Sequence, residues 1–310
     1  MAHEESYTTE ELAQLLKVSK LTIYDLIKKG ELTAYRVGRQ MRVDQSALDA
    51  YKQRSQRHHN LKEKASDHET GANNVANQLR SVVISGQDPC LDILARELDA
   101  KGAYRSLRSH QGSLDSLIAM YHGKADIVST HLFDGDTGTY NIPYIRKLLV
   151  SKAFVVLHLI SRTAGIYVAK DNPLGINDWR DLAQENVRIV NREPGAGARV
   201  LLDEQLRLAD IPRAAVKGYD QEQTSHLSIA SMVASGRADA GIGIEQTAKL
   251  AGITFLPMRT ESYDLVLLRT EANKQLIADI QMLLKRKTLQ DELASLGYDI
   301  AGMGDILYEQ

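Results

Sequence analysis

Residues 7–51 constrain the fold of this chain more than any other stretch, because they carry the signals for short helices and a hairpin in a fixed order. Thr8 and Glu11 have the spacing of a capping box, which predicts a helix that begins near Thr9. A second helix is predicted within residues 19–30, where a serine can serve as the N-cap and a glycine can end the helix. The two helices would be joined by a tight turn.

A basic hairpin and a third helix follow. Residues 34–43 alternate around Gly38–Arg39, which predicts two strands at 34–37 and 40–43. Asp44 can then cap a helix that continues through Tyr51. Two helices across a turn, a basic hairpin and a third helix are the plan of a winged helix-turn-helix, which predicts binding to double-stranded DNA.

The charge distribution fits this interpretation. Residues 17–57 hold ten Lys and Arg against four Asp and Glu, although the whole chain has a net charge of only −2. The second helix would place its outward residues on bases and phosphates, and the hairpin would place its arginines on phosphates or in the minor groove. The residues expected to contact DNA are Ser19, Lys20, Thr22, Tyr24, Lys28, Arg36, Arg39 and Arg42. A solvated basic helix or a small three-helix interaction module is the alternative.

Residues 7–52 resemble the excisionase-family helix-turn-helix, which is related to the winged domain of MerR-type regulators. The resemblance lies in YTTEELAQLLKVSKLTIYDLIKKGEL and in the hairpin YRVGRQMRV. Asp25 departs from the family, in which a basic residue is common at this position, so the base-reading face differs here.

Bulk properties place limits on the remainder. A chain of 310 residues has room for about two to three domains. Its composition, 43% hydrophobic and 25% charged, is that of an ordinary globular protein. The single cysteine, Cys90, excludes a disulfide framework within one chain. The N-terminus lacks the regions of a signal peptide, and apolar runs such as Ala153–Ile160 are too short to cross a membrane, so we expect a cytoplasmic protein.

The expected domains are a DNA-binding domain at 1–55, a polar linker at 56–78 and an α/β domain at 79–310. From Ser81 onward short apolar runs alternate with helical segments, which predicts mainly parallel sheets. The predicted strands are 81–85, 104–107, 125–129, 153–160, 165–169, 187–190, 239–244, 253–257 and 265–268.

Small and hydroxyl residues follow several of these strands, at the turns that lead into helices. Examples are SGQDP after residues 81–85, SHQGS after 104–107, and NREPGAGAR after 187–190. Turns of this kind leave backbone N–H groups at helix N-termini, where an anion is stabilised. The run PGAGAR lacks the ending of a phosphate loop for ATP, so a nucleotide is not favoured. Several such turns around one crevice predict a site for a small anion.

Residues 81–290 resemble the type II periplasmic-binding-protein fold, and more narrowly the molybdate-binding-like domain. The resemblance lies in GQDPCLDILA, HLFDGDTGTYN, NREPGAGARVLLDEQL and HLSIASMVASGRADAGIGIE. It implies a lobe I at about 79–163 and 264–310, a lobe II at about 164–263, and a ligand cleft between them, with molybdate or tungstate as the effector and no cofactor. The residues that it implies as ligand contacts are Ser85, Ser113, Ser129, Thr130, His131, Arg192, Gly197, Ala198, Arg199 and Thr224, with Tyr140 and Tyr144 at the rim. Arg192 could instead tie its loop to its own lobe, and His131 could cap its own loop.

The fold class predicted is therefore α/β, a winged helix-turn-helix joined to a two-lobed binding domain. Catalysis is not favoured, because Asp88 and His131 lack a third partner and no metal cluster is indicated. The predicted function is a ligand-responsive transcriptional regulator, which operator symmetry favours as a homodimer or higher homo-oligomer. The alternatives are a regulator that senses another anion of carboxylate, sulfate or phosphate type, and an excisionase-like DNA accessory protein.

Overall fold

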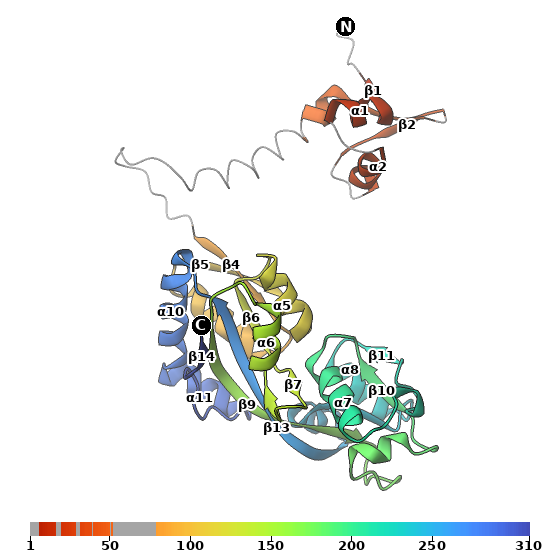
Figure 1. Cartoon of the computed structure of the whole chain (residues 1–310), viewed down its shortest axis with the longest axis vertical. Helices are drawn as coiled ribbons and strands as arrows, with labels where there is room; N and C mark the ends of the chain where they lie inside the picture. Colours follow the sequence, from red (N-terminus) through yellow and green to blue (C-terminus); the bar gives the residue numbers. More distant parts are fainter. Residues whose placement is uncertain (1–5, 17–19, 29–31, 39, 50, 52–78) are drawn as a thin grey trace. The chain divides into compact units, whose positions relative to one another are not determined.

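The computed structural model describes residues 6–16, 20–28, 32–38, 40–49, 51 and 79–310. These residues belong to two compact units that divide near residue 75 (Figure 1). The predicted linker, 56–78, and two predicted DNA contacts, Ser19 and Arg39, lie outside the described residues.

Apart from one additional strand, the first unit has the predicted element order. It contains β1 (Ser6–Thr8), α1 (Thr9–Leu16), α2 (Lys20–Lys28), β2 (Tyr35–Val37) and β3 (Gln40–Asp44), and residues 45–49 are helical. The capping box is confirmed, since the Thr8 amide donates to Oε2 of Glu11 at 2.8 Å and the Glu11 amide donates to Oγ1 of Thr8 at 3.3 Å. The hairpin of β2 and β3 is also confirmed.

One strand of this unit was not predicted. β1 pairs with β3 in antiparallel fashion, with Tyr7 opposite Val43, which gives the strand order β1-β3-β2. Three residues are too few to show an alternating pattern. The sheet and the helices close over the buried side chains of Leu12, Ile23, Leu32, Val43 and Leu48.

The second unit is a mixed α/β structure around one nine-stranded sheet. The strands of this sheet are β4 (Arg80–Ser85), β5 (Tyr104–Ser109), β6 (Ile127–Thr130), β9 (Phe154–Val168), β10 (Ile189–Arg192), β11 (Glu222–Gln223), β12 (Ala240–Ile244), β13 (Thr254–Leu268) and β14 (Ile306–Glu309). A separate two-stranded sheet consists of β7 (Phe133–Asp134) and β8 (Thr139–Tyr140). Its helices are α4 (Cys90–Asp99), α5 (Ser113–Tyr121), α6 (Ile142–Leu148), α7 (Gly197–Leu208), α8 (His226–Ala234), α9 (Glu245–Ala251), α10 (Lys274–Leu284) and α11 (Lys287–Ser295), with 3-10 turns η1 (Trp179–Ala183), η2 (Arg213–Ala215) and η3 (Glu271–Asn273).

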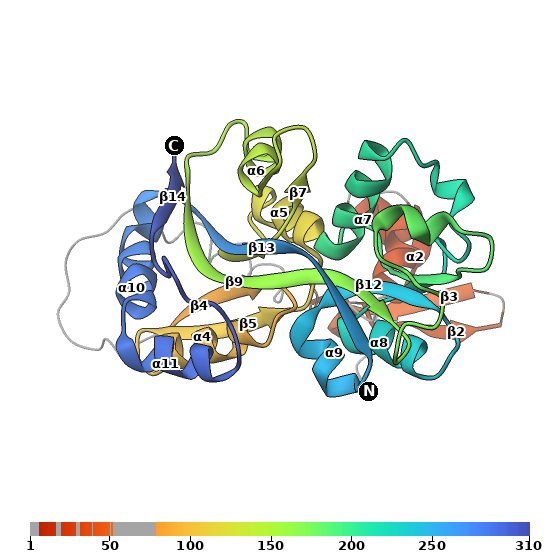
Figure 2. The same cartoon turned by 90° about the horizontal axis from the view of Figure 1, so that it is seen from below.

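Two long strands carry the architecture of this unit. The strand order is β11-β10-β12-β9-β13-β6-β4-β5, with β14 added to β9. β9 and β13 pair along their length in antiparallel fashion and run from one lobe to the other (Figure 2). Each was predicted as two separate strands. The expectation of mainly parallel sheets is wrong at this centre, because β9 is also antiparallel to β12 and β13 to β6, whereas the parallel pairs lie in the outer parts.

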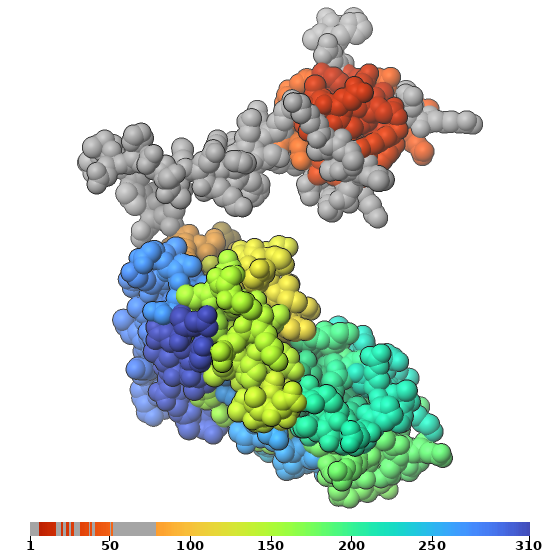
Figure 3. Space-filling model, viewed as in Figure 1, coloured from red at the N-terminus to blue at the C-terminus, as the bar shows by residue number. Residues whose placement is uncertain are grey.

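Each lobe has its own apolar core. In lobe I, α4, α10 and α11 pack on one half of β9 and β13, and in lobe II, α7 and η1 pack on the other half. The hairpin of β7 and β8 belongs to the first lobe in sequence, but Phe133 packs into the core of the second. The two lobes are visible as adjoining masses in the space-filling view (Figure 3). Among the described residues, no helix is long and apolar enough to cross a membrane.

Candidate ligand-binding cleft

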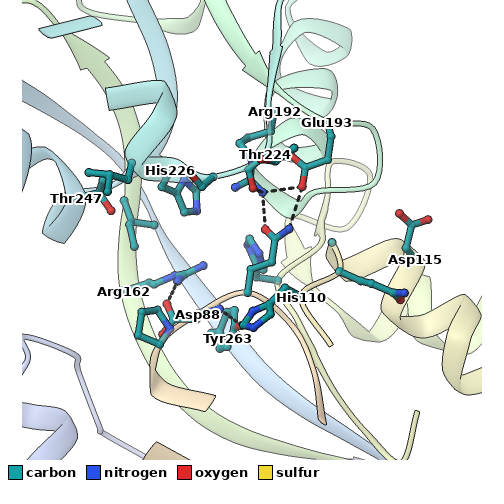
Figure 4. Close-up of a pocket in the computed structure, with 18 of the residues that line it drawn as sticks. Asp88, His110, Asp115, Arg162, Arg192, Glu193, Thr224, His226, Thr247 and Tyr263 are labelled. Atoms are coloured by element: carbon teal, nitrogen blue, oxygen red, sulfur yellow. Dashed lines mark hydrogen bonds and ion pairs between the residues drawn. The ribbon is translucent and has the colours of Figure 1, made fainter. Parts of the chain in front are cut away.

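A cavity of about 690 Å³ lies between the two lobes, where β9 and β13 pass from one to the other (Figure 4). Lobe I, β9 and β13 contribute Gln87, Asp88, Pro89, His110, Gln111, Gly112, Asp115, His131, Arg162 and Tyr263 to its walls. Lobe II contributes Arg192, Glu193, Thr224, Ser225, His226, Leu227, Ile244, Thr247 and Leu250.

Three helices of eight or more residues begin at this cavity. Pro89, Gly112 and Ser225 are the residues that precede α4, α5 and α8, and all three line the cavity. Ser225 also forms a capping box with Ser228, which fixes the start of α8. The partial positive charge of a helix N-terminus favours an anion. The predicted convergence of strand-to-helix turns from both lobes is thus present in the structure.

Arg162 is the centre of a buried charge network at the floor of the cavity. Its Nη1 donates to Oδ2 of Asp88 and its Nε donates to Oε1 of Glu261 at 2.6 Å. Oε2 of Glu261 lies 3.0 Å from Nδ1 of His131, without the geometry of a hydrogen bond. Burial alone would raise the pKa of Glu261, but Arg162 and then His131 hold that pKa well below 4.5. Glu261 therefore carries its charge even though it is buried.

Gln87 joins the two lobes across the cavity. Its Oε1 accepts from Nη2 of Arg192, and its Nε2 donates to Oε1 of Glu193 at 3.0 Å. Arg192 also donates from Nε to Oε2 of Glu193 at 2.8 Å and from Nη2 to the carbonyl of Thr224 at 3.2 Å. The sequence left two positions open for the side chain of Arg192, and the structure shows both: it lines the cavity and it forms hydrogen bonds within its own lobe.

His226 is the first residue of α8 and faces the cavity with part of its ring. Its Nδ1 atom is buried and has no hydrogen-bond partner among the described residues. Burial lowers the pKa of His226 well below 6.5, and Arg192 and Arg162 lower it further. His226 is therefore a neutral imidazole close to two guanidinium groups.

The ten predicted ligand contacts divide into two groups. His131, Arg192 and Thr224 line the cavity. Ser85, Ser113, Ser129, Thr130, Gly197, Ala198 and Arg199 lie outside its lining, as do Tyr140 and Tyr144. Several of these residues support the walls: Ser129 Oγ bonds the hydroxyl of Tyr263 at 2.7 Å, and Arg199 donates to the carbonyl of Arg192 at 2.9 Å.

Other lining residues were not predicted. Gln87 and Asp88 lie within the turn SGQDP after β4, and His226 is the first residue of the run HLSIASMVASGRADAGIGIE, so both segments were identified from the sequence although these side chains were not. Arg162 and Glu261 had no such signal, because each interrupts a buried strand where an apolar residue is expected.

In the first unit, the described DNA-contact candidates differ in their surroundings. Tyr24 and Arg36 are exposed. Lys20 pairs with Glu10, and Nη1 of Arg42 donates to Oγ of Ser6 at 3.1 Å. Thr22 and Lys28 also belong to α2.

Two family models match the chain. The model of the PBP superfamily domain matches residues 95–285, and that of a helix-turn-helix domain matches residues 6–56. The uncharacterized protein YvgK of Bacillus subtilis (strain 168) is 45% identical over 310 residues, which cover 100% of both chains.

Two solved structures show the same fold at low sequence identity. A substrate-binding protein from Clostridium perfringens with bound phosphate aligns with a TM-score of 0.53 and 14% identity, over 71% of this chain and 99% of that one. An H2O2-bound mutant of OxyR from Corynebacterium glutamicum aligns with a TM-score of 0.53 and 14% identity, over 98% of this chain and 92% of that one. The chain therefore belongs to the PBP superfamily and joins a domain of that superfamily to an N-terminal helix-turn-helix domain.

Proposed function

We propose that this protein is a ligand-responsive, DNA-binding transcriptional regulator whose effector is a small oxyanion bound in the interlobe cavity. The observation that carries the proposal is the cavity itself, which three helix N-termini and two arginines from the two lobes and their connecting strands surround. Its fusion to a helix-turn-helix domain gives ligand binding a DNA-binding output.

Molybdate and tungstate are the effectors that the sequence resemblance implies, and we propose them as the first oxyanions to test. Thr224 and His226 supply a hydroxyl and an imidazole beside Arg192, and α8 directs its N-terminus toward the same space. Donors arranged in this way distribute the charge of a tetrahedral anion. The phosphate bound by the Clostridium perfringens protein makes phosphate, and with it sulfate, the natural comparison.

The effector would act by changing the preferred arrangement of the lobes. Gln87 already connects the lobes through hydrogen bonds to Arg192 and Glu193. An anion that accepts a hydrogen bond from Nη2 of Arg192 would replace the bond between Arg192 and Gln87. A ligand shifts such an equilibrium only by its difference in affinity for the two arrangements. In a homodimer, the shift would change the spacing of two helix-turn-helix domains on an operator.

Calorimetry on the full chain with molybdate, tungstate, sulfate and phosphate tests the effector. Arg192→Met should weaken binding at least tenfold, whereas Arg180→Met, an exposed arginine of lobe II outside the cavity, should leave it unchanged. DNA output is tested on duplexes selected from a random-sequence pool, by measuring affinity with and without saturating anion. Equal DNA affinity in both states would contradict the proposed regulation.

A further inference from the structure

The cavity is larger than a bare inorganic oxyanion requires. Its volume is about 690 Å³, whereas four oxygen atoms fill roughly 120 Å³ at about 30 Å³ for each water-sized group. Cavities of roughly 300–1,000 Å³ are those that enclose whole organic ligands. An inorganic anion would leave most of this space to water.

One wall of the cavity is apolar and open. Three apolar residues of lobe II line it, namely Ile244 at the end of β12, Leu227 on α8 and Leu250 on α9. Leu227 is 58% exposed and Leu250 is 82% exposed. Single exposed leucines are common on protein surfaces, but these two share one cavity wall. Covering them with hydrocarbon would remove apolar surface from water, which is favourable.

The charged side chains around the cavity sum to a negative charge, because Arg162 and Arg192 stand against the carboxylates of Asp88, Asp115, Glu193 and Glu261. Arg162 is paired with Asp88 and Glu261, and Arg192 is paired with Glu193. A dianion would therefore approach carboxylates without an unpaired arginine to offset the repulsion, and a single negative charge meets less of it. One donor at the cavity has no partner among the described residues, because Nη2 of Arg162 makes no hydrogen bond there.

We infer that the effector is an organic monoanion, namely a carboxylate with an apolar body. This inference rests on the proposed function and names the chemical class of its ligand. The carboxylate accepts a hydrogen bond from Nη2 of Arg162, whose guanidinium group is drawn at the cavity in Figure 4. The hydrocarbon body covers Ile244, Leu227 and Leu250. The guanidinium group of Arg162 selects for a carboxylate, and the apolar wall selects for the size of the hydrocarbon body.

The test is calorimetry on the full chain with acetate, butanoate, hexanoate and phenylacetate, beside molybdate and phosphate. Affinity should rise about fourfold for each methylene that enters the cavity. Leu250→Ser should flatten this rise, since it removes part of the apolar wall from a side chain that is already exposed. Met282→Ser is the matched control, because Met282 is 59% exposed on α10 and lies outside the cavity lining.

The outcomes separate the inference from the proposal on which it rests. Equal affinities along the carboxylate series, or tighter binding of molybdate than of hexanoate, would overturn the organic ligand and leave the oxyanion regulator intact. A rise that Leu250→Ser does not flatten would overturn the placement of the apolar body. Failure of all six anions to bind would remove the oxyanion effector itself, and the inference with it.

Discussion

Arg162 and Glu261 face each other across β9 and β13, with Nε of the arginine 2.6 Å from Oε1 of the glutamate. The pair lies where the two strands pass between the lobes, and Arg162 lines the cavity there. Both side chains are 2% exposed. The strands that connect the lobes are thus joined by a buried ion pair beside the interlobe cavity.

Glu261→Gln should destabilise the second unit by up to about 3 kcal/mol, the low end of the cost of breaking a buried ion pair, because Arg162 then keeps only Asp88 as a charged partner. Urea unfolding measures the effect. Asp291→Asn is the control, since Asp291 pairs with Lys287 on the surface of α11 and such a pair contributes at most about 0.5 kcal/mol. Similar losses from both variants would show that the Arg162–Glu261 pair has no special weight.

The same pair explains the main error in the sequence prediction of the fold. β9 and β13 were each divided into two strands because polar residues interrupt the apolar pattern near their middle, among them Arg162 and Glu261. A polar residue can lie in a buried strand when its partner lies opposite on the neighbouring strand, and the sequence of one strand does not reveal that partner. The strands whose pattern is uninterrupted, such as β4 and β12, were predicted within one or two residues.

The interlobe cavity was predictable to the level of its loops. The turns before α4, α5 and α8 line the cavity as expected, because the position of a strand-to-helix turn follows from local sequence. Which side chain of a turn enters the cavity depends on contacts between distant segments. Ser85 was expected to face the ligand, but its Oγ instead bonds Oγ of Ser116 at 2.8 Å in the interior.

Gly197→Ala should change the approach of the two lobes. A Cβ atom on Gly197 would lie 2.4 Å from two ring atoms of His131 on the other side of the cleft. We expect a loss of about 1–3 kcal/mol in stability from this overlap and weaker ligand binding. In a His131→Ala background the overlap is gone, and Gly197→Ala should then be neutral or stabilising by up to about 1 kcal/mol, through the unfolded state. Additive effects in this double-mutant cycle would argue against the contact between the lobes.

His226 should make stability depend on pH in a defined window. Its pKa in the folded protein lies well below 6.5, so below pH 6.5 the unfolded chain binds a proton that the folded protein does not. Stability is therefore lost as the pH falls below about 6.5. His226→Gln should make urea-unfolding free energies less dependent on pH between 7 and 5. An unchanged slope would assign the pH dependence to other groups.

The first unit allows a test that separates DNA contact from structural support. Arg36 is exposed on the hairpin, whereas Arg42 is partly buried and donates to Ser6 on β1. If Arg36 contacts a phosphate, Arg36→Ala should weaken binding to all duplexes and reduce the slope of log affinity against log salt by about 1, without changing thermal stability. Arg42→Ala should lower the stability of the unit, because it removes a bond between β3 and β1. Fluorescence anisotropy at four salt concentrations and thermal unfolding of both variants provide the comparison. An Arg36→Ala protein that binds DNA with an unchanged salt slope would exclude Arg36 from the DNA-binding surface.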